Sequence, residues 1–202
     1  MRENSARLEW SGDMKVKQKA RPAIVAGPIR LDIGCGKNKK PGFVGMDQYP
    51  MEGVDVVHDV RKPWPYENES VEEVHCSHFL EHLTGEERVT FFNELYRVMK
   101  PGAKAMIITP HWASGRAYGD PTHKWPPVSE FGFFYLLRNW RESNAPHTDA
   151  KWNKSGYDCD FECTGGYSMH PSIVPRDQSY QQYALQHYKE AAQDTITTLT
   201  RK

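Results

Sequence analysis

Two glycines that follow a short apolar run limit the folds open to this chain. They lie in the stretch LDIGCGKNKKPGFVGMD at residues 31–47, where a second apolar run ends in an acid. Short apolar runs bounded by turn residues are typical of buried strands, so we expect strands at 30–34 and 43–47. Pro41 and Gly42 follow the glycines too closely for a full helix to fit, so a loop joins the two strands.

The remaining sequence alternates between helix and strand patterns. Thr84 and Glu87 form a capping-box pattern, and apolar residues at helical spacing continue to Met99 before Pro101-Gly102 ends the helix. Further elements are expected as helices from Ser129 and over 179–192, and as strands at 54–59, 71–76, 103–109, 157–170 and 195–200. This order predicts an α/β fold with a mostly parallel sheet that ends in a hairpin pair.

The composition favours one cytoplasmic domain. The chain has 202 residues, and we expect an N-terminal arm at 1–27 and a single domain at 28–202. Lys plus Arg and Asp plus Glu are both 26, so nucleic-acid binding through broad phosphate neutralisation is not favoured, and the basic run at 15–21 is interpreted as solvated. No apolar run approaches the length of about 20 residues that crosses a bilayer, and no signal-peptide core is present.

The cysteines do not have the spacing of a zinc ribbon. None forms a CxxC pair, so we interpret them as reduced thiols. They are Cys35, Cys76, Cys159 and Cys163.

Acids stand beside the glycines at the ends of the first three expected strands. Ligands of open α/β sheets bind outside the carboxyl ends of the strands, and glycine lets ligand atoms approach the backbone. Asp47 is placed to accept hydrogen bonds from ribose hydroxyls, and Asp59 from an adenine amine. Asp32 suits the cationic end of a ligand. A tight turn without a ligand explains Gly34 and Gly36 as well, so the functional interpretation depends on the acids.

The spacing differs from that of a dinucleotide site. A GxGxxG fingerprint needs a third glycine and a helix N-terminus that faces the pyrophosphate. Lys39 stands three residues after Gly36, and the helix is missing. A nucleoside that carries a positive charge therefore fits this loop better than a pyrophosphate does.

The segments LDIGCGKNKKPGFVGMD, HDVRKPWPYENESVEEVHCSHFLEHL and FFNELYRVMKPGAKAMIITP resemble the class I methyltransferases that use S-adenosylmethionine, in a small methyltransferase-11-like form with a shortened glycine loop. The resemblance covers residues 30–110. It implies a Rossmann-like sheet of about seven strands, mostly parallel with an antiparallel C-terminal strand, and helices on both faces. It also implies cofactor contacts from Asp32, Gly34, Cys35, Gly36, Asp47, Gln48, Asp59, Val60, Ser77 and His78, whereas His82 is expected to orient structure.

The loop after the fifth strand contains the candidate catalytic residues. We predict His111 or His123 as a general base, with Asp120 fixing the tautomer of the histidine. Two alternatives stay open, namely a loop in which these residues only cap turns and a metal site formed by all three. Of these interpretations we favour those without a metal.

The segment 111–170 is expected to supply the substrate side of the pocket. Aromatic residues in its loops are the candidate substrate contacts, namely Trp112, Tyr118 and Trp125. The predicted function is methyl transfer from S-adenosylmethionine to a small-molecule or modified-polymer acceptor, with the oligomeric state left open. The alternatives are a non-catalytic sensor or partner subunit that binds S-adenosylmethionine, and a nucleotide-sugar or nicotinamide enzyme.

Overall fold

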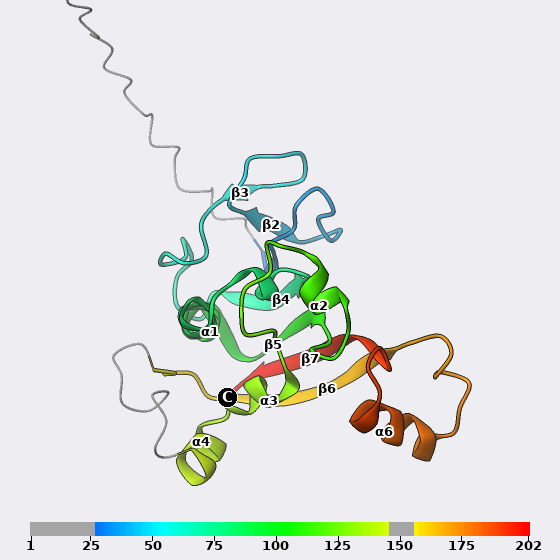
Figure 1. Cartoon of the computed structure of the whole chain (residues 1–202). Helices are drawn as coiled ribbons and strands as arrows, with labels where there is room; N and C mark the ends of the chain where they lie inside the picture. Colours follow the sequence, from blue (N-terminus) through cyan, green and yellow to red (C-terminus); the bar gives the residue numbers. More distant parts are fainter. Residues whose placement is uncertain (1–26, 146–155) are drawn as a thin grey trace, which may run out of the picture.

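The computed structural model describes residues 27–145 and 156–202. Nearly all of the expected N-terminal arm, and most of the loop expected at 144–156, lie outside these residues. The described chain forms a seven-stranded sheet in the order β3-β2-β1-β4-β5-β7-β6 (Figure 1). The strands are β1 (Ile29–Ile33), β2 (Val44–Asp47), β3 (Val56–Val57), β4 (Val71–Ser77), β5 (Met99–Pro110), β6 (Phe161–Met169) and β7 (Ala192–Arg201).

The sheet has the predicted mixture of strand directions. Strands β1 to β5 pair in parallel, whereas β7 runs antiparallel to both β5 and β6. The sheet confirms the expected fold class. Because the first five strands are parallel, their carboxyl ends meet at one edge, where ligands of such sheets bind.

The main helix begins where the sequence predicts it. Helix α1 (Gly85–Val98) has Thr84 as its N-cap, and both halves of the capping box with Glu87 are formed. The helix ends before Met99, however, which already belongs to β5 together with Pro101-Gly102. The pairing of β4 with β5 shifts register at this point, and the extra residues form an irregularity in the strand rather than a helix end.

The other helices are short. The expected helix after Ser129 is split in two, and the expected helix over 179–192 stops earlier, so that β7 begins at Ala192. The elements are η1 (Leu80–His82, a 3-10 helix), α2 (Arg116–Gly119), α3 (Glu130–Phe134), α4 (Arg138–Asn144) and α6 (Gln178–His187).

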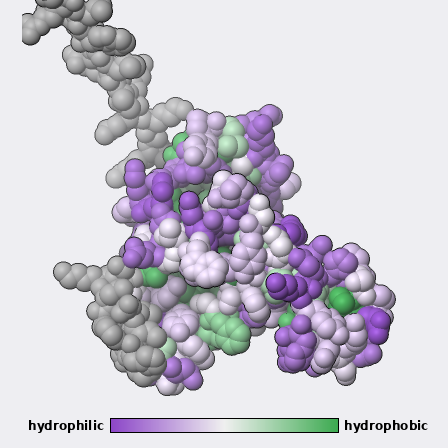
Figure 2. Space-filling model, in the orientation of Figure 1, coloured by the Kyte–Doolittle hydropathy of each residue, from purple (hydrophilic) through white to green (hydrophobic). Residues whose placement is uncertain are grey.

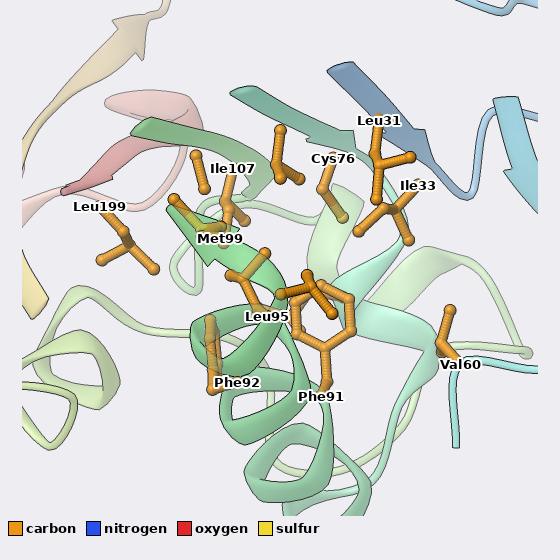
Figure 3. Close-up of a cluster of buried hydrophobic side chains, with 14 of the residues drawn as sticks. Leu31, Ile33, Val60, Cys76, Phe91, Phe92, Leu95, Met99, Ile107 and Leu199 are labelled. Carbon is orange, nitrogen blue, oxygen red and sulfur yellow. The ribbon is translucent and has the colours of Figure 1, made fainter. Parts of the chain in front are cut away.

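The hydrophobic core lies on one face of the sheet. Figure 3 shows Phe91 and Leu95 of α1 directed at the strands, and both side chains are fully buried. Phe133 of α3 joins the same cluster. On β5, buried Ala105 and Ile107 alternate with the more exposed Lys104 and Met106, which face the other way. Within residues 27–145 and 156–202, the helices that build the core therefore cover one face.

The segment between β3 and β4 contains no helix, and side chains of α1 fix its position. The main-chain N–H of Trp64 donates to Glu94 over 2.6 Å, and Arg97 donates to the Trp64 carbonyl over 3.1 Å. Trp64 itself packs against Phe91. Parallel strands are usually joined by a crossover helix. Between β3 and β4, these contacts hold the connecting segment in place without one.

The face of the molecule drawn in Figure 2 is mostly hydrophilic. Figure 2 shows purple and pale side chains over most of one face, with hydrophobic side chains in small separate patches. No helix among the described residues has the length and hydrophobicity needed to span a membrane.

Candidate functional site

The glycine loop is closed by hydrogen bonds to carboxylates. Gly36 donates its N–H to Asp47 over 3.1 Å. The Lys40 N–H donates to Asp32 over 2.7 Å, and the second oxygen of Asp32 accepts from His75 Nδ1 over 2.8 Å. Buried polar groups need such partners, so Asp32 is satisfied inside the protein.

The two glycines have different structural roles. Both have positive φ, at 68° for Gly34 and 50° for Gly36. A Cβ placed on Gly34 would lie 2.3 Å from the ring of Phe79, whereas a Cβ on Gly36 would meet nothing within 4 Å. Gly34 is therefore required by the packing of Phe79, whereas a side chain at Gly36 would meet no neighbouring atom.

A cavity of about 300 Å³ opens at the carboxyl ends of β1, β2 and β3. Its volume lies at the lower end of the range of about 300–1,000 Å³ that is common for ligand sites. The cavity is lined by Gly34, Met46, Asp47, Gln48, His58, Asp59, Val60, Arg61, Phe79, His82, Leu83, Thr84, Glu87 and Lys124.

The predicted cofactor residues divide into two groups. Gly34, Asp47, Gln48, Asp59 and Val60 line the cavity together. The other five do not line it, and they are Asp32, Cys35, Gly36, Ser77 and His78.

Each residue outside the cavity wall has a structural explanation. Asp32 does not line the cavity, and its carboxylate holds the loop through Lys40 and the strand through His75. Cys35 is buried, and burial together with nearby carboxylates raises the pKa of its thiol to about 11. Ser77 ends β4, and Gly36 contributes through its N–H bond to Asp47.

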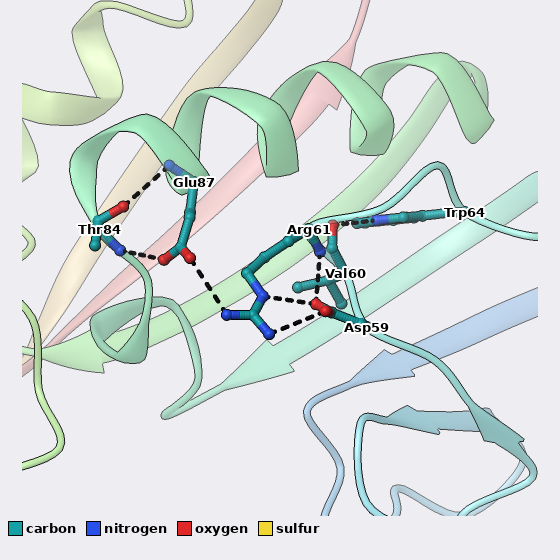
Figure 4. Close-up of polar contacts among 6 residues, drawn as sticks. All are labelled: Asp59, Val60, Arg61, Trp64, Thr84 and Glu87. Atoms are coloured by element: carbon teal, nitrogen blue, oxygen red, sulfur yellow. Dashed lines mark hydrogen bonds and ion pairs between the residues drawn. The ribbon is translucent and has the colours of Figure 1, made fainter.

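Asp59 has a cationic partner that the sequence analysis did not consider. Arg61 donates to its carboxylate through Nε over 2.8 Å and through a terminal nitrogen over 2.9 Å, and also contacts Glu87 over 3.5 Å (Figure 4). These hydrogen bonds lower the pKa of Asp59. A carboxylate accepts about four hydrogen bonds, so Asp59 retains capacity for a ligand amine at the cavity wall.

His78 is held in a strained conformation at the end of β4. Its φ is 52°, which is uncommon for a residue other than glycine. Its ring lies 3.5 Å from Glu81 and 4.0 Å from Asp194. The hydrogen bond to Glu81 raises the pKa of His78.

A second cavity, of about 690 Å³, contains all three predicted substrate residues. It is lined by Leu80, Gly85, Arg88, Phe92, Trp112, Tyr118, Trp125, Pro126, Pro127, Val128, Ser129, Phe131, Gly132, Phe133 and Tyr157. Two chain segments contribute to both cavities. Leu80 faces the second cavity and His82 the first, and Trp125 faces the second and Lys124 the first.

The predicted catalytic residues are not brought together as one group. His111 is 3% exposed and packs against Trp112 and Tyr167. It lines neither cavity. His123 instead packs edge-on against His82, with ring centroids 4.9 Å apart.

The tautomer of His123 is not fixed by Asp120, contrary to the prediction. His123 Nδ1 donates to the Ala117 carbonyl over 3.1 Å, while Asp120 lies 3.9 Å from Nε2. Asp120 instead accepts from the Thr122 hydroxyl over 2.7 Å.

Sequence reasoning missed several residues that line the first cavity. Arg61 and Phe79 directly follow predicted positions, so their closeness to the motif was the available signal. His82 was noticed but assigned a structural role. Lys124 lies far along the chain and reaches the cavity because its N–H donates to the Glu81 carbonyl over 2.8 Å, a contact that leaves no pattern in the sequence.

We expect Gly34→Ala to lower the free energy of unfolding by about 2–4 kcal/mol, because the new methyl group overlaps Phe79 and the φ is left-handed. Gly36→Ala introduces only the strained φ, so its free energy of unfolding should fall by about 1–2 kcal/mol. Urea unfolding of both variants measures the difference. Equal losses would contradict the role assigned to Phe79.

Burial lowers the pKa of His111, an effect that Glu130 and Glu190 only partly oppose. In the unfolded chain the pKa of a histidine is about 6.5. Below that pH, His111 binds a proton more readily in the unfolded chain than in the folded one, so the free energy of unfolding falls as the pH falls. We therefore expect the parent to lose more stability than His111→Asn between about pH 7.5 and about pH 5. Urea unfolding at both pH values tests this, with His187→Asn as an exposed control. Equal losses in parent and His111→Asn would contradict it.

Comparison with known proteins finds a partial family match and solved structures with a similar fold. Residues 37–107 match the family model described as a methyltransferase domain. The chain is similar to a SAM dependent methyltransferase from Archaeoglobus fulgidus, with 21% identity, a TM-score of 0.62 and coverage of 87% of each chain. The search of curated proteins finds no match.

Two further solved structures are less similar. One is a SAM-dependent methyltransferase from Methanosarcina mazei, with 15% identity, a TM-score of 0.49 and coverage of 85% of this chain and 91% of that chain. The other is phosphoethanolamine N-methyltransferase 2 from Haemonchus contortus in complex with S-adenosyl-L-methionine, with 15% identity, a TM-score of 0.44 and coverage of 87% and 49%. The sheet order and the similarity to the Archaeoglobus structure show that this chain has the class I methyltransferase fold, and residues 37–107 match the methyltransferase domain model.

Proposed function

We propose that this protein transfers a methyl group from S-adenosylmethionine to an acceptor molecule. The observation that carries the proposal is the pair of cavities on either side of η1 and Lys124-Trp125. The first has acids at the strand ends, and the second has aromatic walls. Because the same two segments line both cavities, a donor in the first and an acceptor in the second would lie side by side, and direct displacement requires the two cavities to meet between these segments.

The residues of the first cavity fit the proposed cofactor. Asp47 has oxygens at the end of β2 for ribose hydroxyls, and Asp59 and Val60 form the wall expected for adenine. When bound, S-adenosylmethionine supplies a methyl group activated by a sulfonium. No helix follows β1 to receive a pyrophosphate, which argues against the nicotinamide and nucleotide-sugar alternatives.

The second cavity fits an acceptor with an apolar body. Trp112, Tyr118 and Trp125 provide its aromatic surface. Arg88 also lines it, and one terminal nitrogen of its guanidinium is buried without a hydrogen bond among the described residues. An acceptor with an anionic or carbonyl group would satisfy that nitrogen. The acceptor is therefore proposed to be a small molecule, or a modified group on a polymer, that combines both features.

Methyl transfer by displacement needs alignment of the nucleophile more than it needs a dedicated base. The catalytic roles of His111, Asp120 and His123 stay predictions. Neither histidine lines a cavity, but His123 contacts His82, which lines the first cavity, and this contact supports His123 over His111. The cytoplasmic location and the single domain at 28–202 also stay predictions. A non-catalytic sensor would be expected to have its acceptor side closed, whereas a cavity of about 690 Å³ is present.

Two binding experiments and one labelling experiment test the function. Calorimetry should show binding of S-adenosylmethionine and none of NAD. Incubation with cell extract and S-adenosylmethionine labelled in the methyl group should then transfer label to an acceptor. Binding of NAD instead would contradict the proposed cofactor. Binding of S-adenosylmethionine without any labelled product would contradict the proposed methyl transfer.

We expect Asp47→Ala to weaken binding of S-adenosylmethionine by about 1–3 kcal/mol, because hydrogen bonds to a charged group are lost. Calorimetry provides the measurement. Glu52→Ala is the matched control, since Glu52 is exposed and does not line the cavity. Urea unfolding separates loss of binding from loss of the Gly36–Asp47 contact. Unchanged affinity in a folded Asp47→Ala variant would contradict the placement of the ribose.

A further inference from the structure

We propose that Glu81, His82 and His123 form a binding site for a divalent transition-metal ion. Each residue offers one ligand atom, and the three atoms lie within 4.8 Å of one another. The metal alternative considered from the sequence, formed by His111, Asp120 and His123, is a different group. The three residues come together because the fold places the loop after β5 against η1.

The main chain fixes the position of the cluster. Glu81 and His82 are consecutive residues of η1, and His123 comes from the loop after α2. The Lys124 N–H donates to the Glu81 carbonyl over 2.8 Å, which holds the two segments together. The histidine rings also touch edge to face. A site whose ligands are held before the metal arrives loses less conformational entropy on binding.

Hydrogen bonds set both histidines in the same tautomer. The Thr122 hydroxyl donates its one proton to Asp120, so it must accept from His82 Nδ1, which lies 3.0 Å away. His123 Nδ1 donates to the Ala117 carbonyl. Both rings therefore carry their proton on Nδ1 and present the lone pair of Nε2. Histidines that bind metals usually donate their other nitrogen in this way.

Glu81 is an independent sign of a missing ligand. Its side chain is only 5% exposed, and Oε1 lies 3.5 Å from His78 Nδ1. Its other oxygen, Oε2, is buried and accepts no hydrogen bond from the described residues. Burial of an unpaired carboxylate oxygen is costly, and a cation beside it would remove that cost.

The ligand set indicates the class of metal. Two imidazole nitrogens and one carboxylate oxygen suit Zn²⁺ and related ions better than Ca²⁺ or Mg²⁺, which prefer oxygen. Three protein ligands leave a coordination position for water or an added ligand. Since His82 lines the first cavity and Leu80 the second, the ion would lie at the partition between them.

Metal binding can be measured without any methyl transfer, so its outcome is independent of the proposed function. The full-length chain, without a histidine tag and stripped with a chelator, is titrated with Co²⁺ and followed by visible absorption. Zn²⁺ affinity is then measured by competition with a coloured chelator. We expect one equivalent of metal per chain, and affinity for Zn²⁺ at least about tenfold lower in His82→Ala, His123→Ala and Glu81→Gln.

Two controls separate the site from general effects. His170→Ala and His187→Ala remove histidines elsewhere in the chain and should leave the affinity for Zn²⁺ unchanged. Thr122→Val alters an exposed residue that holds His82 without being a ligand, and should weaken Zn²⁺ binding by about 10–100-fold even if the buried Glu81 variant fails to fold. Absence of metal uptake by the parent would overturn the proposal. The proposal would also be overturned if folded His82→Ala, His123→Ala and Thr122→Val all bound Zn²⁺ with the same affinity as the parent.

Discussion

The carboxyl edge of this sheet depends on aspartate side chains that bind main-chain N–H groups. Asp32 accepts from Lys40, Asp47 from Gly36, and Asp55 from Gly45 over 2.7 Å. In a longer α/β protein, a helix between the first two strands would satisfy many of these groups within its own backbone. Here no helix intervenes, so carboxylates hold the loop in shape.

These hydrogen bonds connect several strands of the sheet. Asp32 of β1 also accepts from His75 of β4, and Asp55, just before β3, also binds Lys39 over 2.8 Å. The loop is thus fixed from both sides before any ligand is present. Gly36 remains open to space, while Phe79 occupies the position above Gly34. Gly34 and Phe79 therefore form part of the wall of the first cavity, whereas Gly36 lies outside it.

The turn from Leu80 to Gly85 links the two cavities to the core. Leu80 is buried in the main hydrophobic cluster, and Thr84 caps the helix that carries Phe91 into it. A change in the position of this turn would therefore alter the core, the wall of each cavity and the position of Glu81 together. This coupling explains why a strained His78 can persist directly before it, since the surrounding packing determines the backbone.

The sequence by itself determined the order of elements, the sheet, the capping of α1 and the position of the first cavity. Each of these leaves a local pattern, such as an apolar period, a capping pair or an acid at a strand end. Only the tertiary structure decided that Asp32 turns to His75, that Arg61 binds Asp59, and that His123 lies beside His82. Asp32 and His75 are 43 positions apart in the sequence, and His82 and His123 are 41 positions apart. Contacts between distant segments follow from how the chain closes in space, and no periodicity along the chain encodes them.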